Sequence, residues 1–143
     1  EQGAQHSQAL HAWFAHVPGL RVVMPSTVAD ARDLLIASVL CKDPVMYIDD
    51  RWLYEQEDDL EPIVEFDLKN QIPEIISEGK DVTILGSGHA SFLARNAIEE
   101  LKNRNIYPEI IDIRVLNPLY IKDILQSVKK TKKLVVVYPG FLS

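Results

Sequence analysis

Short apolar β-like runs alternate with helical patterns along the whole chain, and this alternation constrains the fold more than any other feature. Residues 20–24 and 44–48 are extended runs that favour strands. Between them Thr27 can cap a helix, because Asp30 follows at capping-box spacing with Asp in place of Glu. The connections are short, so the pattern predicts a β-α-β unit with parallel strands and a right-handed crossover.

The second half of the chain repeats this alternation without repeating the sequence. Its apolar runs have no polar alternation, which is typical of parallel strands buried on both faces. We therefore predict an α/β fold with two parallel-sheet segments. The expected strands are 82–85, 109–113 and 134–137, and the expected helices are 90–103 and 120–130.

An acidic segment separates the two halves. Five of the seven residues in 55–61 are Asp or Glu, so this stretch cannot form a core. It is interpreted as a solvated linker, with an acidic recognition tag as the alternative. We place a domain boundary near Asp58, which gives segments 1–58 and 59–143, and expect residues 63–76 to lead onto the second sheet.

Charge and cysteine content exclude several classes of protein. The net charge of -6 and pI near 5.1 argue against a nucleic-acid surface and against binding to an anionic membrane. The single cysteine, Cys41, excludes an internal disulfide and favours a reducing compartment. No apolar stretch is long enough to span a bilayer, and no signal-peptide pattern is present.

Three histidines, His6, His11 and His16, are spaced by five residues. On a helix such residues point about 140° apart, so they would not converge on one metal. His11 and His16 are expected at the surface or at a helix end. His6 lies between polar residues ahead of an apolar run. Its imidazole could serve in acid–base chemistry, but the residues alone favour a hydrogen-bonded structural role.

The stretch Gly86-Ser87-Gly88 follows a predicted strand and opens a predicted helix, which invites a dinucleotide-binding interpretation. The third glycine of that motif is absent, because its position is Ser91. Ser87 does not lie in a G-x-S-x-G nucleophile elbow either. The pattern therefore predicts a tight strand-to-helix turn without a bound phosphate.

Longer motifs resemble a known family. The run GAQHSQALHAWFAHVPGLRVVMPSTVADARDLL, then DPVMYIDD, GKDVTILGSGHA and EIIDIRVLNPLYIKDILQSVKKTKKLVVV, resembles the beta subunit of thiamine-diphosphate-dependent 2-oxo acid dehydrogenases. Pyruvate, branched-chain 2-oxo acid and acetoin dehydrogenases belong to this group. The resemblance covers nearly the whole chain. It implies the end of a thiamine-binding pyrimidine domain followed by most of a transketolase-type C-terminal domain.

The resemblance also implies a function. His6 matches the family's active-site histidine, which is thought to meet the substrate carboxylate. The expected activity is oxidative decarboxylation of a 2-oxo acid with thiamine diphosphate and Mg²⁺, followed by acyl transfer to lipoyl groups on a core acyltransferase. An alpha subunit is the expected partner, because in the family it binds the diphosphate. The compartment is then the cytoplasm, or the mitochondrial matrix in a eukaryote.

The family carries the glutamate that activates thiamine in a segment preceding the Q-H-S-Q motif, so we expect no catalysis from residues 1–143 alone. We also expect self-association through an apolar patch at Trp13, Phe14 and Trp52. Two other functions stay open. One is a non-catalytic assembly module derived from the C-terminal domain. The other is a small nucleotide-binding domain that uses Gly86 and Gly88.

A potassium-binding loop of some relatives aligns with Ser38, Val39, Cys41 and Asp43. The backbone carbonyls of Ser38 and Val39 and the carboxylate of Asp43 are the candidate ligands. Cys41 replaces the usual aspartate and Asp43 replaces an asparagine. A thiolate is a poor ligand for a hard cation, so the resemblance only weakly implies a potassium site.

Overall fold

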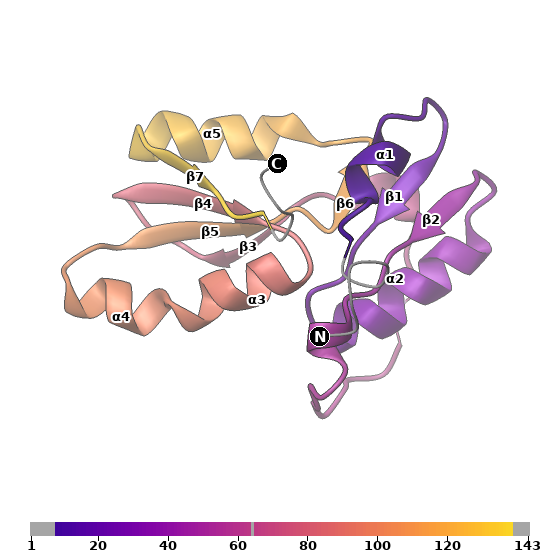
Figure 1. The fold of residues 1–143 in the computed structure, drawn as a ribbon, viewed down its shortest axis with the longest axis horizontal. Coiled ribbons are helices and arrows are strands. Elements are labelled where there is room, and N and C mark those ends of the chain that lie inside the picture. The colour runs from indigo at the N-terminus through magenta and orange to yellow at the C-terminus, as the bar shows by residue number, and fades with distance from the viewer. Residues whose placement is uncertain (1–7, 64, 139–143) are drawn as a thin grey trace.

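Two sheets lie side by side in the computed structural model, which describes residues 8–63 and 65–138 (Figure 1). The three-stranded sheet has the order β2-β1-β6, and the four-stranded sheet has the order β3-β5-β4-β7. The pairs β1–β2, β4–β5 and β4–β7 are parallel, which confirms the α/β prediction. The strands are β1 (Arg21–Val23), β2 (Val45–Tyr47), β3 (Glu74–Ser77), β4 (Val82–Gly86), β5 (Pro108–Asp112), β6 (Val115–Asn117) and β7 (Leu134–Val136).

The first sheet carries α2 (Val28–Leu40) as its crossover helix, after the short α1 (His11–Ala15). The Thr27 hydroxyl accepts a hydrogen bond from the Asp30 backbone N–H at 3.0 Å, so the predicted helix cap is confirmed. Leu34 on the inner face of α2 is fully buried against Val23 of β1. A 3₁₀ turn, η2 (Arg51–Leu53), follows β2.

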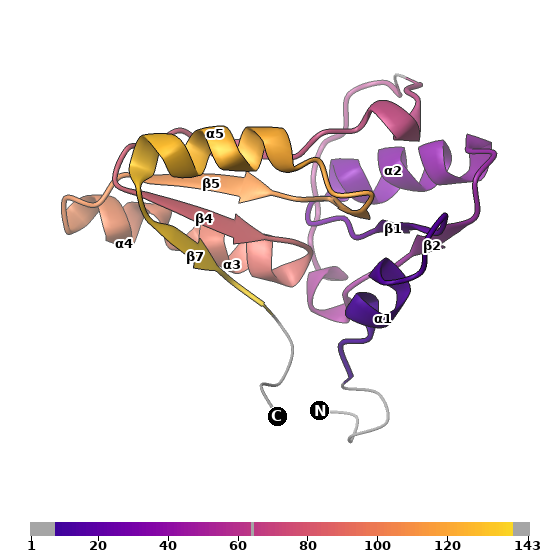
Figure 2. The same ribbon diagram turned by 90° about the horizontal axis from the view of Figure 1, so that it is seen from above.

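The second sheet is covered on both faces, with α3 (His89–Asn96) and α4 (Ile98–Asn103) on one side and α5 (Ile121–Thr131) on the other (Figure 2). Neighbouring strand residues point to opposite faces. Ile84 and Ile110 pack against α3, whereas Leu85 and Ile111 pack against Ile124 of α5. The prediction that these apolar strands are buried on both faces is confirmed for β4 and β5. It was wrong for β7, whose residues are exposed because β7 is an edge strand of the sheet.

The helix predicted at 90–103 is divided at Ala97. The Ala97 backbone N–H lies 3.2 Å from both the Leu93 and the Ala94 carbonyl oxygens, so one donor is shared between two acceptors. Ala97 therefore caps the end of α3 and the start of α4. No glycine or proline in the sequence signals this break.

Strand β6 was not predicted, and it connects the second half of the chain to the first sheet. After β5 the backbone of Arg114 adopts a φ of 54°, and the chain then pairs antiparallel with β1. Val115 and Leu68 are both buried in the core that contains Val23. Residues beyond the acidic segment thus complete the core of the first sheet. Strand β3 is likewise antiparallel, to β5.

The acidic segment is exposed, as predicted, from Glu55 to Asp59 and again at Glu61 and Pro62. Its described hydrogen bonds include one from Arg32 Nη1 to the Glu61 carbonyl oxygen at 2.9 Å and one from the Gln56 backbone N–H to the Leu53 carbonyl oxygen at 3.0 Å. Within the described part of the chain, no helix is long and apolar enough to cross a membrane.

Candidate functional site

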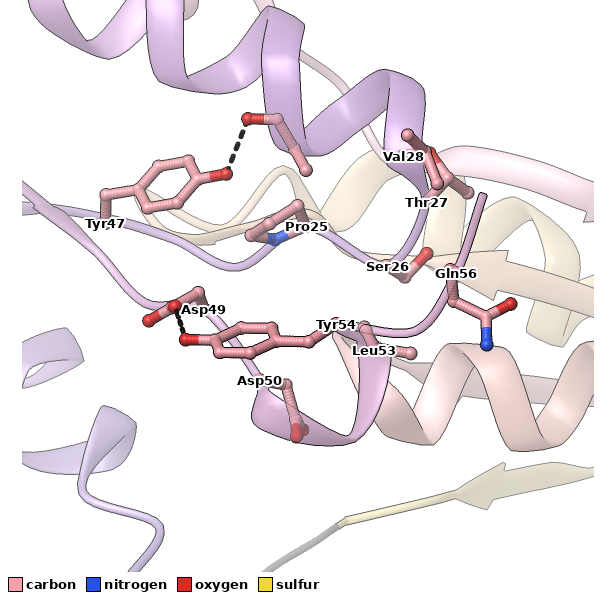
Figure 3. Close-up of a pocket in the computed structure, with 11 residues that line it drawn as sticks. Pro25, Ser26, Thr27, Val28, Tyr47, Asp49, Asp50, Leu53, Tyr54 and Gln56 are labelled. Carbon is pink, nitrogen blue, oxygen red and sulfur yellow. Dashed lines mark hydrogen bonds between the residues drawn. The ribbon is translucent and has the colours of Figure 1, made fainter. Parts of the chain in front are cut away.

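A pocket of about 210 Å³ lies at the carboxyl ends of β1 and β2, the edge where open α/β sheets bind ligands (Figure 3). We call it the carboxyl-edge pocket. The turn after β1 forms one wall, and the segment between β2 and the acidic linker forms the other. Its lining residues include Pro25, Ser26, Thr27, Tyr47, Asp49 and Tyr54.

Several polar groups of the carboxyl-edge pocket already have partners within the protein. The Tyr47 hydroxyl donates to the Ala31 carbonyl oxygen at 2.8 Å, and the Tyr54 hydroxyl donates to Asp49 (Figure 3). Burial, helped by nearby carboxylates, raises the pKa of Tyr47 to about 12, so this phenol stays protonated at neutral pH. The pocket can enclose an apolar group beside negative charge.

A second polar group, which we call the inter-sheet cluster, consists of Ser26, Asp30, Ser91, Asp112 and Arg114. Asp112 ends β5 and is fully buried. Its carboxylate accepts hydrogen bonds from the Ser26 hydroxyl and, at 2.9 Å, from the Ser91 hydroxyl. Burial raises the pKa of Asp112 to about 6, against the opposing effect of the two serine hydrogen bonds.

Arg114 forms the other half of the inter-sheet cluster. Its Nη1 atom lies 3.1 Å from Asp30 Oδ1 on α2 and 3.4 Å from Glu74 Oε2 on β3. Its Nη2 atom donates to the Ile72 carbonyl oxygen at 2.8 Å. Its backbone carbonyl accepts from the Met24 N–H at 2.8 Å. One residue therefore contacts both sheets through its side chain and its backbone.

The Gly86–Gly88 segment is the predicted tight turn, and α3 begins directly after it. A Cβ atom at Gly86 would lie 2.8 Å from the Ser91 backbone nitrogen, and Gly88 has a φ of 54°. Ser91 stands in the first turn of α3 and donates to the Asp112 carboxylate. The anion at this helix start is thus the protein's own side chain, which argues against a dinucleotide phosphate there.

The two described histidines of the N-terminal segment agree with the prediction of a surface or helix-end position. His6, the predicted catalytic residue, lies outside the described residues. His11 is the first residue of α1, which is one of the two expected positions, a helix end, although its side chain is only 7% exposed. It packs against Tyr138, with ring centroids 4.9 Å apart, and burial lowers the pKa of its imidazole despite the opposing charge of Asp50. His16 follows α1 and is exposed, as expected.

The candidate potassium ligands Ser38, Val39 and Asp43 lie at the end of α2 and in the loop to β2. Asp43 Oδ2 accepts from Arg21 Nε at 2.9 Å, and Asp43 Oδ1 lies 3.4 Å from Lys69 Nζ. The Ser38 hydroxyl donates to the Leu34 carbonyl oxygen at 2.6 Å. Both carboxylate oxygens therefore face cationic side chains. These side chains fit a potassium ion poorly, and the backbone carbonyls of Ser38 and Val39 are left as candidate donors.

Sequence reasoning missed the inter-sheet cluster. The available signal was a carboxylate directly after the apolar pair Ile110-Ile111, at the end of a strand expected to be buried on both faces. A buried charge needs partners. The partners, Ser26 and Ser91, are 86 and 21 residues away in sequence, so only the fold brings them together. Across the described ranges 8–63 and 65–138, no three or more His, Cys, Asp or Glu side chains are arranged to hold a metal ion.

Comparison with known proteins gives consistent matches along the chain. Residues 1–56 match the transketolase pyrimidine-binding domain, and residues 73–141 match the transketolase C-terminal domain. A structural relative, described as a split gene transketolase in an inactive beta4 tetramer, superimposes with a TM-score of 0.75 at 23% identity. That alignment covers 94% of this chain and 44% of the relative, and it supports the fold.

Among curated relatives, the pyruvate dehydrogenase E1 component subunit beta of Rhizobium meliloti is 40% identical over 96% of this chain and 30% of its own length. The mitochondrial 2-oxoisovalerate dehydrogenase subunit beta of Dictyostelium discoideum is 36% identical over 94% of this chain and 36% of its own. The beta subunit of the acetoin:2,6-dichlorophenolindophenol oxidoreductase of Cupriavidus necator is 40% identical over 94% and 39%. The chain thus spans less than half the length of these relatives. It carries segments of the transketolase pyrimidine-binding and C-terminal domains, and its sequence is similar to the beta subunits of pyruvate and 2-oxoisovalerate dehydrogenases and of an acetoin oxidoreductase.

Proposed function

We propose that the chain is part of the beta subunit of a thiamine-diphosphate-dependent 2-oxo acid dehydrogenase. The activity is oxidative decarboxylation of a 2-oxo acid, followed by acyl transfer to lipoyl groups on a core acyltransferase. The observation that carries this proposal is the 36–40% identity to such beta subunits over 94–96% of the chain. Because these relatives are named for different substrates, the proposal extends to the class of substrate and not to one acid.

The division of the chain is also a proposal. Residues 1–58 form the carboxyl-terminal part of a pyrimidine-binding domain, and residues 59–143 form an incomplete transketolase-type C-terminal domain. The exposed acidic segment around Asp58 supports this boundary, as do the matched ranges 1–56 and 73–141. Leu68 and β6 pack on the first sheet, so contacts between the two segments are extensive.

His6 is proposed as the residue that meets the substrate. A 2-oxo acid carries a carboxylate, and a protonated imidazole can donate a hydrogen bond to it and move a proton near neutral pH. The support is the match of Gln5-His6-Ser7-Gln8 to the family motif. The carbanion chemistry itself belongs to the cofactor.

The carboxyl-edge pocket does not fit the diphosphate end of thiamine diphosphate. Asp49 and Asp50 line the carboxyl-edge pocket, and its lining includes neither Lys nor Arg, so a diphosphate there would meet like charge. We propose that an alpha subunit holds the diphosphate and its Mg²⁺, and that the complete enzyme is a hetero-oligomer. The proposed compartment is the cytoplasm, or the mitochondrial matrix in a eukaryote. The mitochondrial name of the Dictyostelium relative supports the second part of this proposal.

The test uses the full-length protein that contains these residues, co-purified with its alpha subunit and assayed with several 2-oxo acids and an artificial electron acceptor. We expect turnover of at least one acid. His6→Ala should lower kcat/KM by roughly 10²–10⁴-fold, the usual contribution of acid–base catalysis. His16→Ala is the matched control, because His16 is exposed, and it should keep wild-type activity. Absence of turnover with every acid contradicts the function, whereas full activity of His6→Ala contradicts only the role of His6.

A further inference from the structure

We infer that Asp112 is a positioning residue that fixes the β1–α2 turn, a wall of the carboxyl-edge pocket, to the four-stranded sheet. This inference goes beyond the proposed function and holds for any ligand that the pocket takes. It predicts that the orientation of Pro25–Thr27 depends on a hydrogen bond between the turn after β1 and the end of β5. Ser26 is the donor and Asp112 is the acceptor.

The two serines of the inter-sheet cluster have different structural roles. Ser26 and Ser91 are 3% and 0% exposed, and both donate to the same carboxylate. Ser91 belongs to α3, which packs on the four-stranded sheet that contains Asp112. Its hydrogen bond therefore joins that sheet to its own covering helix. Ser26 lies in the turn between β1 and α2, so its hydrogen bond joins the two sheets.

The surroundings of Asp112 explain why a carboxylate stands there. Its two oxygens accept two hydroxyl donors and the Arg114 backbone N–H, which lies 3.3 Å from Oδ1. An alkyl side chain at this position would leave both serine hydroxyls buried without an acceptor, which is costly. The charged groups nearest to it are Asp30, Arg114 and, through Arg114, Glu74. Asp112 therefore serves as the common acceptor between the layers.

Two further contacts between the three-stranded and the four-stranded halves of the structure can be measured independently. The Met24 N–H donates to the Arg114 carbonyl oxygen, so its rate of hydrogen exchange measures how often the first sheet separates from the β5–β6 turn. Trp52 in η2 stacks on His89 at the start of α3, with centroids 5.8 Å apart and an interplanar angle of 20°. The emission of Trp52 therefore reports contact between the two halves.

The experiment compares Ser26→Ala with Ser91→Ala, since both variants remove one buried donor from the same acceptor. In Ser26→Ala we expect the Met24 amide to exchange roughly tenfold faster relative to Ile110 in the centre of β5, which is the effect of losing one hydrogen bond to a charged group. In Ser91→Ala the ratio of the Met24 exchange rate to the Ile110 exchange rate should stay at the wild-type value. Within residues 1–143 a Trp13→Phe background leaves Trp52 as the sole tryptophan, and its emission should change in Ser26→Ala only.

Substitutions of the acceptor complete the test. Asp112→Ala should accelerate Met24 exchange at least as much as Ser26→Ala, and Asp112→Asn should restore it, because an amide can still accept from a serine. Glu109→Gln is the matched control: this buried carboxylate lies on the same strand but pairs with Lys130. If Ser26→Ala and Ser91→Ala change Met24 exchange equally, or if Ser26→Ala leaves it unchanged, the inference is wrong.

Discussion

Replacing Asp112 by Asn should change how the stability of the fold depends on pH. Burial raises the pKa of this carboxyl from 3.8 to about 6. The folded state then holds the proton more tightly than the unfolded state. Its contribution to stability is complete below pH 3.8 and is lost as the pH rises through 6. The shift is about two pKa units, and one unit corresponds to 1.36 kcal/mol, so the change is about 3 kcal/mol. Asn cannot ionise and should lack this change.

The assay is urea-induced unfolding of the wild type and Asp112→Asn at several pH values between 4 and 7.5. We expect the free energy of unfolding of the variant, minus that of the wild type, to rise by about 2 kcal/mol across this range, because the range begins just above the unfolded pKa. Because a side-chain amide can replace part of the hydrogen bonding, Asp112→Asn should equal or exceed the wild type in stability at pH 7.5.

Glu109→Gln is the control for this experiment. Burial acts to raise the pKa of Glu109, but hydrogen bonds from Lys130, Ser127 and the Gly79 N–H, together with the charge of Lys130, hold it below its usual value. Its contribution to stability is therefore present above its unfolded pKa and lost as the pH falls, which is the opposite sign. A difference between wild type and Asp112→Asn that stays constant across the pH range would refute the reasoning.

Three further predictions concern the turn, the metal and association. Gly88→Ala should lower the free energy of unfolding, measured in urea, by about 1–3 kcal/mol, because a φ of 54° is strained for alanine and the new Cβ would meet Met24. Calorimetric titration of the wild type with NAD or ATP should give no saturable heat. Micromolar binding of either nucleotide would overturn the interpretation of Gly86–Gly88 as a turn without a bound phosphate. At equal ionic strength the melting temperature of the wild type should be no higher in KCl than in choline chloride. Lys69→Gln frees one oxygen of Asp43 and should therefore give a higher melting temperature in KCl than in choline chloride. A higher melting temperature of the wild type in KCl would support the potassium site. Light scattering of residues 1–143 should give a mass above 16.2 kDa, and Trp13→Ser, at a residue 72% exposed, should lower it; a monomeric wild type would contradict the expected apolar patch.

Local sequence patterns predicted most of the elements and the family. Runs of apolar residues located β1, β2, β4, β5 and β7. For β4 and β5 the reason is burial on both faces, which tolerates few polar side chains, whereas β7 is apolar although its residues are exposed. Thr27 and Asp30 predicted the start of α2, since a cap depends on neighbours three residues apart. The Q-H-S-Q motif pointed to one family, and the matched relatives confirmed that resemblance.

Long-range geometry was decided only by the tertiary structure. Arg114 adopts a positive φ without being glycine, so nothing in its type announces that β6 leaves one sheet and joins the other. The positions of Ser26 and Ser91 around Asp112 depend on the packing of α3 and on the pairing of β6 with β1. A sequence lists which residues can donate and accept. Which donor meets which acceptor, and therefore which charge can be buried, is settled only when distant segments pack together.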